Sequence, residues 1–140
     1  MQSITLTTYG KITLFAVANL SKGFSYEEAW KRALHEEGIK GKNCAQAAFV
    51  GLCRAGIITG STILPAKKTI KNRNYVIKGL LHLEKYPQDV YLPPHELWKR
   101  IPITTPVKQS GFQMDIAITL FYYQHYDHNT LKQFEHNIDI

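Results

Sequence analysis

The residues in this sequence whose chemistry is most concentrated are basic. Positions 38–83 contain eight Lys or Arg residues and no acidic residue, which exceeds the net charge of +6 of the whole chain. Ammonium and guanidinium groups bind phosphate and carboxylate groups, and nucleic acid is the commonest polyanion in a cell. The candidate binding residues are Lys40, Lys42, Arg54, Lys67, Lys68, Lys71, Arg73 and Lys78.

The densest part of this tract, residues 67–73, predicts a groove for a phosphate backbone, with Asn72 and Asn74 as further polar contacts. We therefore expect a small binding module whose basic face contacts DNA or RNA. Two alternatives stay open. The same face could meet an acidic protein surface, as in a phage or mobile-element inhibitor of a host protein, or the charge could serve solubility alone.

Catalytic chemistry has no comparable support. The sequence has no glycine-rich phosphate loop, nucleophile elbow or paired zinc-binding motif. His125, Asp127, His128 and His136 are metal-ligand types, but a polar C-terminal segment explains them equally well. We expect no cofactor and no metal, and a small enzyme is the least favoured of the functional readings.

Two cysteines, Cys44 and Cys53, do not predict a disulfide framework. On one helix their separation along the axis would be roughly 13 Å, which is too far to bridge. We expect two buried thiols in a reducing compartment.

Composition predicts an intracellular globular protein. Hydrophobic residues make up 44% of the 140 residues, and sixteen aromatic side chains supply bulk for a core. The longest apolar runs are far shorter than the ~20 residues of a membrane span. The first residues lack the basic and apolar regions of a signal peptide, so we expect a cytoplasmic location.

Helix signals dominate the chain and predict one mainly α domain over residues 1–140, with five to seven helices. Ser25 and Glu28 form a capping box that starts a helix ending at Gly38. Asn43 is expected to cap a central, buried helix that runs to Ala55. The other expected helices are about 8–22 (with a short hairpin as the alternative), 72–86, 94–100, 110–126 with Ser110 and Gln113 as its capping box, and a short one from Thr130.

Residues 57–70 contain Gly60 and Pro65, which favours a loop, or a short β-hairpin that could act as a wing. With helices 25–37 and 43–55 before it, this arrangement is typical of winged-helix DNA-binding domains. The proposed recognition helix offers only Gln46 and Arg54 for reading bases, which argues against that interpretation. Pro102 and Pro106 predict an extended segment over 101–109.

A motif in the middle of the chain resembles a small bacterial domain family of unknown function. The family pattern has a Glu-Ala-Trp helix, here Glu28-Ala29-Trp30, followed by Lys-x-Cys-x-x-x-Ala-Phe-x-Gly-Leu-Cys, here Lys42 to Cys53. A basic, Asn-rich segment follows at residues 71–75, then a Trp and a Gln-Met pair like Trp98 and Gln113-Met114. The resemblance covers most of residues 8–122, and residues 124–140 extend past it. It implies an all-α fold in bacteria or their mobile elements, and no established activity.

Overall fold

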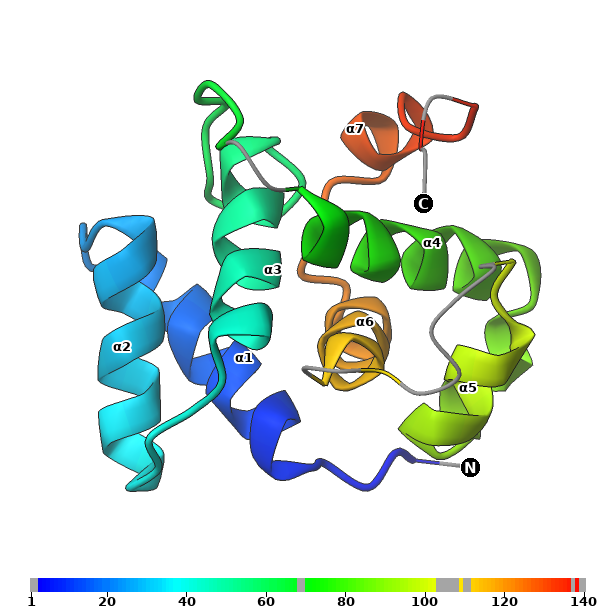
Figure 1. Ribbon diagram of the computed structural model, residues 1–140, viewed down its shortest axis with the longest axis horizontal. Coiled ribbons are helices and arrows are strands. Elements are labelled where there is room, and N and C mark those ends of the chain that lie inside the picture. The colour runs from blue at the N-terminus through cyan, green and yellow to red at the C-terminus, as the bar shows by residue number, and fades with distance from the viewer. Residues whose placement is uncertain (1–2, 68–69, 103–108, 110–111, 137, 139–140) are drawn as a thin grey trace.

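Helices make up most of the residues that the structure describes. The computed structural model describes residues 3–67, 70–102, 109, 112–136 and 138 (Figure 1). Within these ranges there is no strand, which confirms the mainly α prediction. The elements are α1 (Thr8–Leu20), α2 (Tyr26–Glu37), α3 (Asn43–Arg54), α4 (Lys71–Lys85), the 3₁₀ helix η1 (Pro87–Tyr91), α5 (Pro94–Arg100), α6 (Gln113–Tyr123) and α7 (His128–Lys132).

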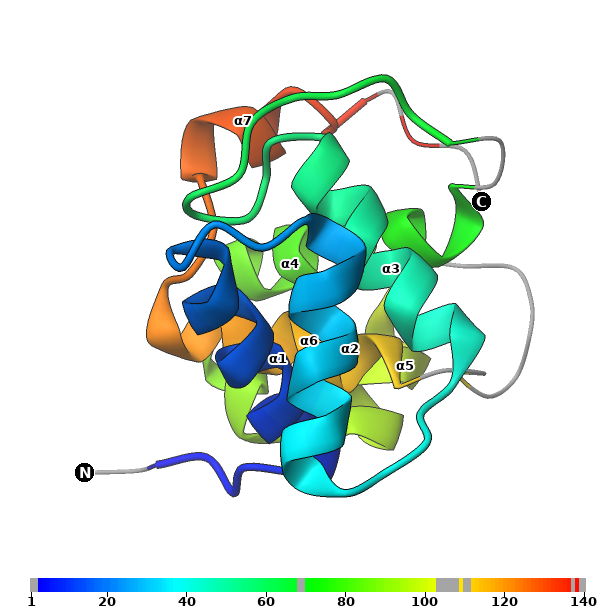
Figure 2. The same ribbon diagram turned by 90° about the vertical axis from the view of Figure 1, so that its left-hand side faces the viewer.

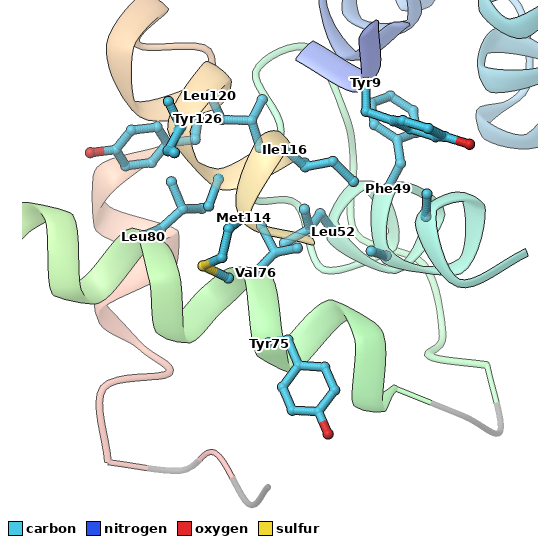
Figure 3. Close-up of a cluster of buried hydrophobic side chains, with 14 of the residues drawn as sticks. Tyr9, Phe49, Leu52, Tyr75, Val76, Leu80, Met114, Ile116, Leu120 and Tyr126 are labelled. Carbon is cyan, nitrogen blue, oxygen red and sulfur yellow. The ribbon is translucent and has the colours of Figure 1, made fainter. Parts of the chain in front are cut away.

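The core is built around α6, which Figure 1 shows nearly end-on between α3, α4 and α5. Every residue from Gln113 to Leu120 is buried, so this helix has no solvent face over its first two turns. Its side chains Met114, Ile116 and Leu120 pack with Val76 and Leu80 of α4 (Figure 3). Burial of this apolar surface stabilises the fold by roughly 25 cal/mol per Å².

The N-terminal helices α1 and α2 lie side by side (Figure 2). Thr7 accepts a hydrogen bond from the Gly10 N–H, so α1 begins as a capped helix and the alternative hairpin does not form. The Ser25 cap is confirmed, since its hydroxyl accepts from the Glu28 N–H at 3.1 Å. Gly38 ends α2 with a φ of 69°, a left-handed conformation that glycine adopts without strain.

Helix α3 crosses close to the start of α4. A Cβ at Gly51 would lie 2.9 Å from the Cβ of Arg73, so only glycine allows this approach. The prediction of a central, buried helix is confirmed by Phe49, Leu52 and Cys53, all of which are fully buried. Cys44 is only half-buried, and both thiols are free.

Two predicted helix starts differ from the structure. Lys42, not Asn43, is the N-cap of α3, and no side-chain hydrogen bond supports it. Helix α6 begins after Phe112, and the Gln109 side chain accepts from the Met114 N–H at 2.7 Å. The capping box expected from Ser110 and Gln113 is therefore wrong, and Ser110 itself lies outside the described residues, as does most of the expected extended segment 101–109.

The segment after α3 is a loop and not a wing. Residues 59–67 contain no strand, Ile58 makes an isolated antiparallel bridge to Tyr126, and residue 71 already begins α4. The winged-helix interpretation is therefore wrong. The loop is held by side chains: the Tyr26 hydroxyl accepts from the Thr62 N–H and donates to its carbonyl, and Arg54 Nε donates to the Pro65 carbonyl at 2.7 Å.

Candidate functional site

The predicted basic residues do not share one face. Lys40 and Lys42 lie before α3, while Arg54 ends that helix about 18 Å further along its axis. Arg54, Lys67 and Arg73 surround one groove. Lys71 and Lys78 lie on α4, and Lys68 is outside the described residues.

The groove, called here the α3–α4 groove, has a volume of about 450 Å³. Its walls come from α3, the loop after it, the first turn of α4 and the residues that follow α7. Ile63 and Leu64 line it and remain 73% and 43% exposed. An apolar wall open to water in this way is typical of a binding surface, because solvent-exposed apolar patches are costly unless something covers them.

The charge on the groove rim is positive on balance. Arg54, Lys67 and Arg73 line it together with one carboxylate, Glu27. Lys67 Nζ lies 2.9 Å from Glu27 Oε2, and this hydrogen bond lowers the pKa of Glu27, so that carboxyl is ionised at neutral pH. Lys67 is thereby largely neutralised, and Arg54 and Arg73 carry the excess charge.

Arg73 is the most constrained of the groove cations. Its Nε donates to Asn74 Oδ1 at 2.9 Å, and its guanidinium lies 5.1 Å from the centroid of the Phe134 ring. Burial lowers the pKa of Arg73, and no carboxylate pairs with it among the described residues. A partly desolvated guanidinium without a counter-ion is stabilised by an incoming anion.

The two asparagines expected to contact phosphate have structural roles instead. Asn74 is buried and accepts the hydrogen bond from Arg73. Asn72 accepts from Gln113 Nε2 at 2.8 Å and so joins the start of α4 to α6. Both hydrogen bonds use the amide oxygen of the asparagine as acceptor.

A second set of cations lies along α4. Lys71, Lys78 and Lys85 follow one another at intervals of seven residues, about two helical turns, and therefore lie on the same side of the helix. Lys71 and Lys85 are exposed and Lys78 is half-exposed. Within the described part of the chain none of the three pairs with a carboxylate. We call these three residues the α4 lysine row.

Sequence reasoning missed the last member of this row. Lys85 follows Glu84, which ended the acid-free tract along the chain. In the fold, Glu84 Oε2 accepts from the Tyr126 hydroxyl at 2.9 Å and also pairs with His128. The i, i+7, i+14 spacing of the three lysines was visible in the sequence and would have found Lys85.

A depression beside the α4 lysine row adds one more cation, Lys132, that forms no ion pair among the described residues. Arg100 and Lys132 line it together with Lys78 and Lys85, and Glu84 and Glu135 are its acidic members. Asp89 binds His82 Nε2 at 2.7 Å and Arg100 at 3.3 Å, which fixes η1 and α5 against α4. The depression therefore extends the basic surface around the C-terminal half of α4.

The C-terminal histidine and aspartate residues are used in packing and capping. Asp127 caps α7 by accepting from the Thr130 N–H at 2.8 Å, and His128 pairs with Glu84. Across the described ranges no three His, Cys, Asp or Glu side chains are arranged to hold a metal ion. Among those same ranges, no helix has both the length and the apolar character required to cross a bilayer.

The fold and the site thus define a helical protein with a basic, partly apolar groove and a row of lysines that form no ion pair with the described carboxylates. Comparison with protein families places residues 6–127 in one family, so the chain belongs to the family of unknown function DUF6979. This confirms the resemblance to a family of unknown function, and the match extends slightly past the expected residues 8–122 at both ends. Comparisons with curated proteins and with solved structures found no match.

Proposed function

We propose that this protein is a small nucleic-acid-binding module that contacts backbone phosphates through the α4 lysine row. Arg54 and Arg73 add positive charge near the N-terminal end of α4, and Lys132 adds it near the other end. On this proposal the protein works in the cytoplasm, where it meets cellular nucleic acid.

The observation that carries the proposal is the absence of acidic partners along the row. Lys71, Lys78 and Lys85 span about 21 Å of helix, and no described carboxylate forms an ion pair with any of them. Lysines kept for solubility alone are usually interspersed with acidic residues. A regular row of cations instead suits the regular array of phosphates on a nucleic acid. The nucleic acid releases its condensed counter-ions when lysines neutralise those phosphates.

The chemistry of the row also predicts weak sequence preference. Lysine is a flexible point charge that pairs with phosphate oxygens, and sequence is read only where side chains reach the base edges. The Oδ1 atoms of Asn72 and Asn74 already accept hydrogen bonds within the protein. We therefore expect binding that tolerates changes of nucleotide sequence.

The test is a triple variant in which Lys71, Lys78 and Lys85 are each replaced by Gln. This change preserves helix propensity and removes three charges. Affinity for a fluorescein-labelled oligonucleotide is measured by anisotropy over a series of salt concentrations. The wild-type protein should lose affinity steeply with salt, and the variant should bind at least about tenfold more weakly at low salt. The dependence of log K on log salt should flatten by about 2–3, because each neutralised phosphate contributes about 0.7–0.9.

A matched control distinguishes local contact from net charge. Lys11, Lys22 and Lys31 are exposed and lie on or just after α1 and α2. Replacing these three with Gln removes the same charge and should leave affinity and salt slope near wild type. Equal losses in the two variants would show that only net charge matters and would contradict the proposal.

Poly-L-glutamate is the probe for the competing reading, in which the same surface meets an acidic protein. The proposal expects oligonucleotide to bind more tightly than polyglutamate of similar charge. Tighter binding of polyglutamate would favour the acidic protein partner and would overturn the nucleic-acid proposal.

A further inference from the structure

The α3–α4 groove has features that phosphate binding alone does not explain. A surface that contacts only a nucleic-acid backbone needs cations and polar groups, but this groove exposes Ile63 and Leu64 beside Arg54 and Arg73. Its volume of about 450 Å³ falls within the roughly 300–1,000 Å³ typical of small-ligand sites. Its occupant should therefore combine an apolar body with negative charge.

We propose that the α3–α4 groove receives an unstacked base of a single-stranded nucleic acid whose backbone follows the α4 lysine row. This inference rests on the proposed function and makes it more specific. Lys71 and Arg73 both lie in the first turn of α4, but about 200° apart around the helix, so the row and the groove lie on different sides of that turn. A strand that follows the row would pass around the N-terminal end of α4 to place a base in the groove.

Arg73 is suited to contact such a nucleotide. Its guanidinium is held by Asn74 and backed by the Phe134 ring, which restricts its movement. Bases in single strands stack on aromatic rings and on guanidinium planes, and the adjacent phosphate pairs with the positive charge. Gln46, which also lines the groove, supplies an amide that can donate to or accept from a base edge.

The groove also selects single strands over duplexes. In a duplex the bases are stacked and paired, so their apolar faces cannot enter a protein groove unless the duplex is opened. A duplex can therefore use the α4 lysine row but not the apolar part of the groove. Single strands should bind more tightly than duplexes of the same sequence.

The test fills the groove without changing its charge. Ala47 and Ala66 are exposed and line the groove, so the double substitution Ala47→Leu/Ala66→Leu adds bulk where the base would lie. Leu offers no aromatic plane on which a base could stack. Ala18→Leu, at an exposed position on α1, is the control for added surface apolarity.

Binding is measured by anisotropy with a labelled single strand about twelve nucleotides long, within the ~4–16 nucleotide range of single-strand sites, and with its duplex. The double variant should bind the single strand at least about fivefold more weakly and the duplex as the wild type does. The Ala18→Leu control should match wild type on both, and circular dichroism should be unchanged.

Each outcome separates the inference from the proposed function. If the filled variant binds single strand and duplex as tightly as wild type, the groove is not used, although binding through the α4 lysine row stands. Equal losses on both nucleic acids would show that the groove does not receive a base, which also overturns the inference. If wild type binds neither nucleic acid, both proposals fail.

Discussion

Arg73 connects the packing of this protein to its proposed chemistry. The same residue packs against Gly51 where α3 and α4 cross, donates to Asn74 and lines the α3–α4 groove. Its position is therefore set by the core and not by a flexible surface chain. A cation held in this way loses less conformational entropy on binding an anion than a free lysine does.

Trp30 is the residue whose truncation should destabilise the folded protein most. It is fully buried, and its ring lies 5.1 Å from Phe49 and 6.4 Å from Tyr9, measured between centroids. Trp30→Ala should lower the free energy of unfolding by about 3–5 kcal/mol, because a large cavity is left behind. Urea denaturation followed by circular dichroism measures the change.

A second variant at this position separates ring packing from hydrogen bonding. The indole N–H of Trp30 has no hydrogen-bond partner among the described residues. Trp30→Phe keeps an aromatic ring and removes that unpaired donor. It should therefore lower the free energy of unfolding clearly less than Trp30→Ala does. If both variants lowered the free energy of unfolding equally, ring packing against Phe49 would not account for the stabilisation by Trp30.

Asp115 should make stability depend on pH. Burial raises the pKa of Asp115 above its usual 3.8, against opposing hydrogen bonds from Thr7 and Gln109. The folded protein then holds this proton more tightly than the unfolded chain. Stability is therefore highest below pH 3.8 for this group and falls as pH rises through the folded pKa.

Asp115→Asn removes this dependence. Relative to wild type, the variant should gain stability between pH 3.8 and neutral pH, with the difference measured by urea denaturation at each pH. Asp127→Asn is a control of opposite sign, because the Thr130 N–H lowers the pKa of Asp127 and the charged form is favoured. A constant difference between Asp115→Asn and wild type at all pH values would contradict the assignment.

The crossing of α3 and α4 is the element-scale contact that shapes the groove. An added Cβ at Gly51 would approach Arg73 Cβ to 2.9 Å, and Arg73 Cβ is fixed by the backbone of α4. Gly51→Ala should therefore destabilise the protein by about 1–3 kcal/mol, as overpacked core substitutions do. At an open helical position the same change would stabilise by about 1 kcal/mol, so a rise in the melting temperature would show that the helices are not in contact there.

Local sequence signals predicted those elements whose ends depend on nearby residues. Ser25 and Glu28 are three residues apart, so their capping geometry does not depend on the rest of the fold. The start of α6 depends on Gln109 and on the contact of Gln113 with Asn72 of α4, which no local rule contains. The local sequence of residues 57–67 did not decide between a loop and a hairpin. The contacts that hold this loop come from Tyr26 on α2 and Arg54 on α3, which no local rule contains.

Charge patterning predicted part of the candidate site and missed the rest. Counting charge along the chain identified Arg54, Lys67, Lys71, Arg73 and Lys78 but also included Lys40 and Lys42, which lie at the other end of α3. The acid-free tract ends at Glu84, so this count left out Lys85. In the fold, the Glu84 side chain is engaged by Tyr126 and His128. The distribution of charge on a helical surface follows the helical period and not the order of residues, and that period identifies Lys85.

At the scale of the whole molecule, positive charge gathers along α4. The groove cations lie at the N-terminal end of this helix, the α4 lysine row follows it, and Arg100 and Lys132 lie near its other end. Figure 1 shows α4 between the end of α3 and α5, with α7 above it, so one helix joins both basic regions.

Mapping of amide chemical shifts by NMR during titration with a short single strand tests this account most directly. We expect the largest, salt-sensitive shifts on α4 and around the α3–α4 groove, including Gly51 and Ile63. Shifts concentrated on α1 and α2, or no shifts at low salt, would contradict the assignment of nucleic-acid binding to α4.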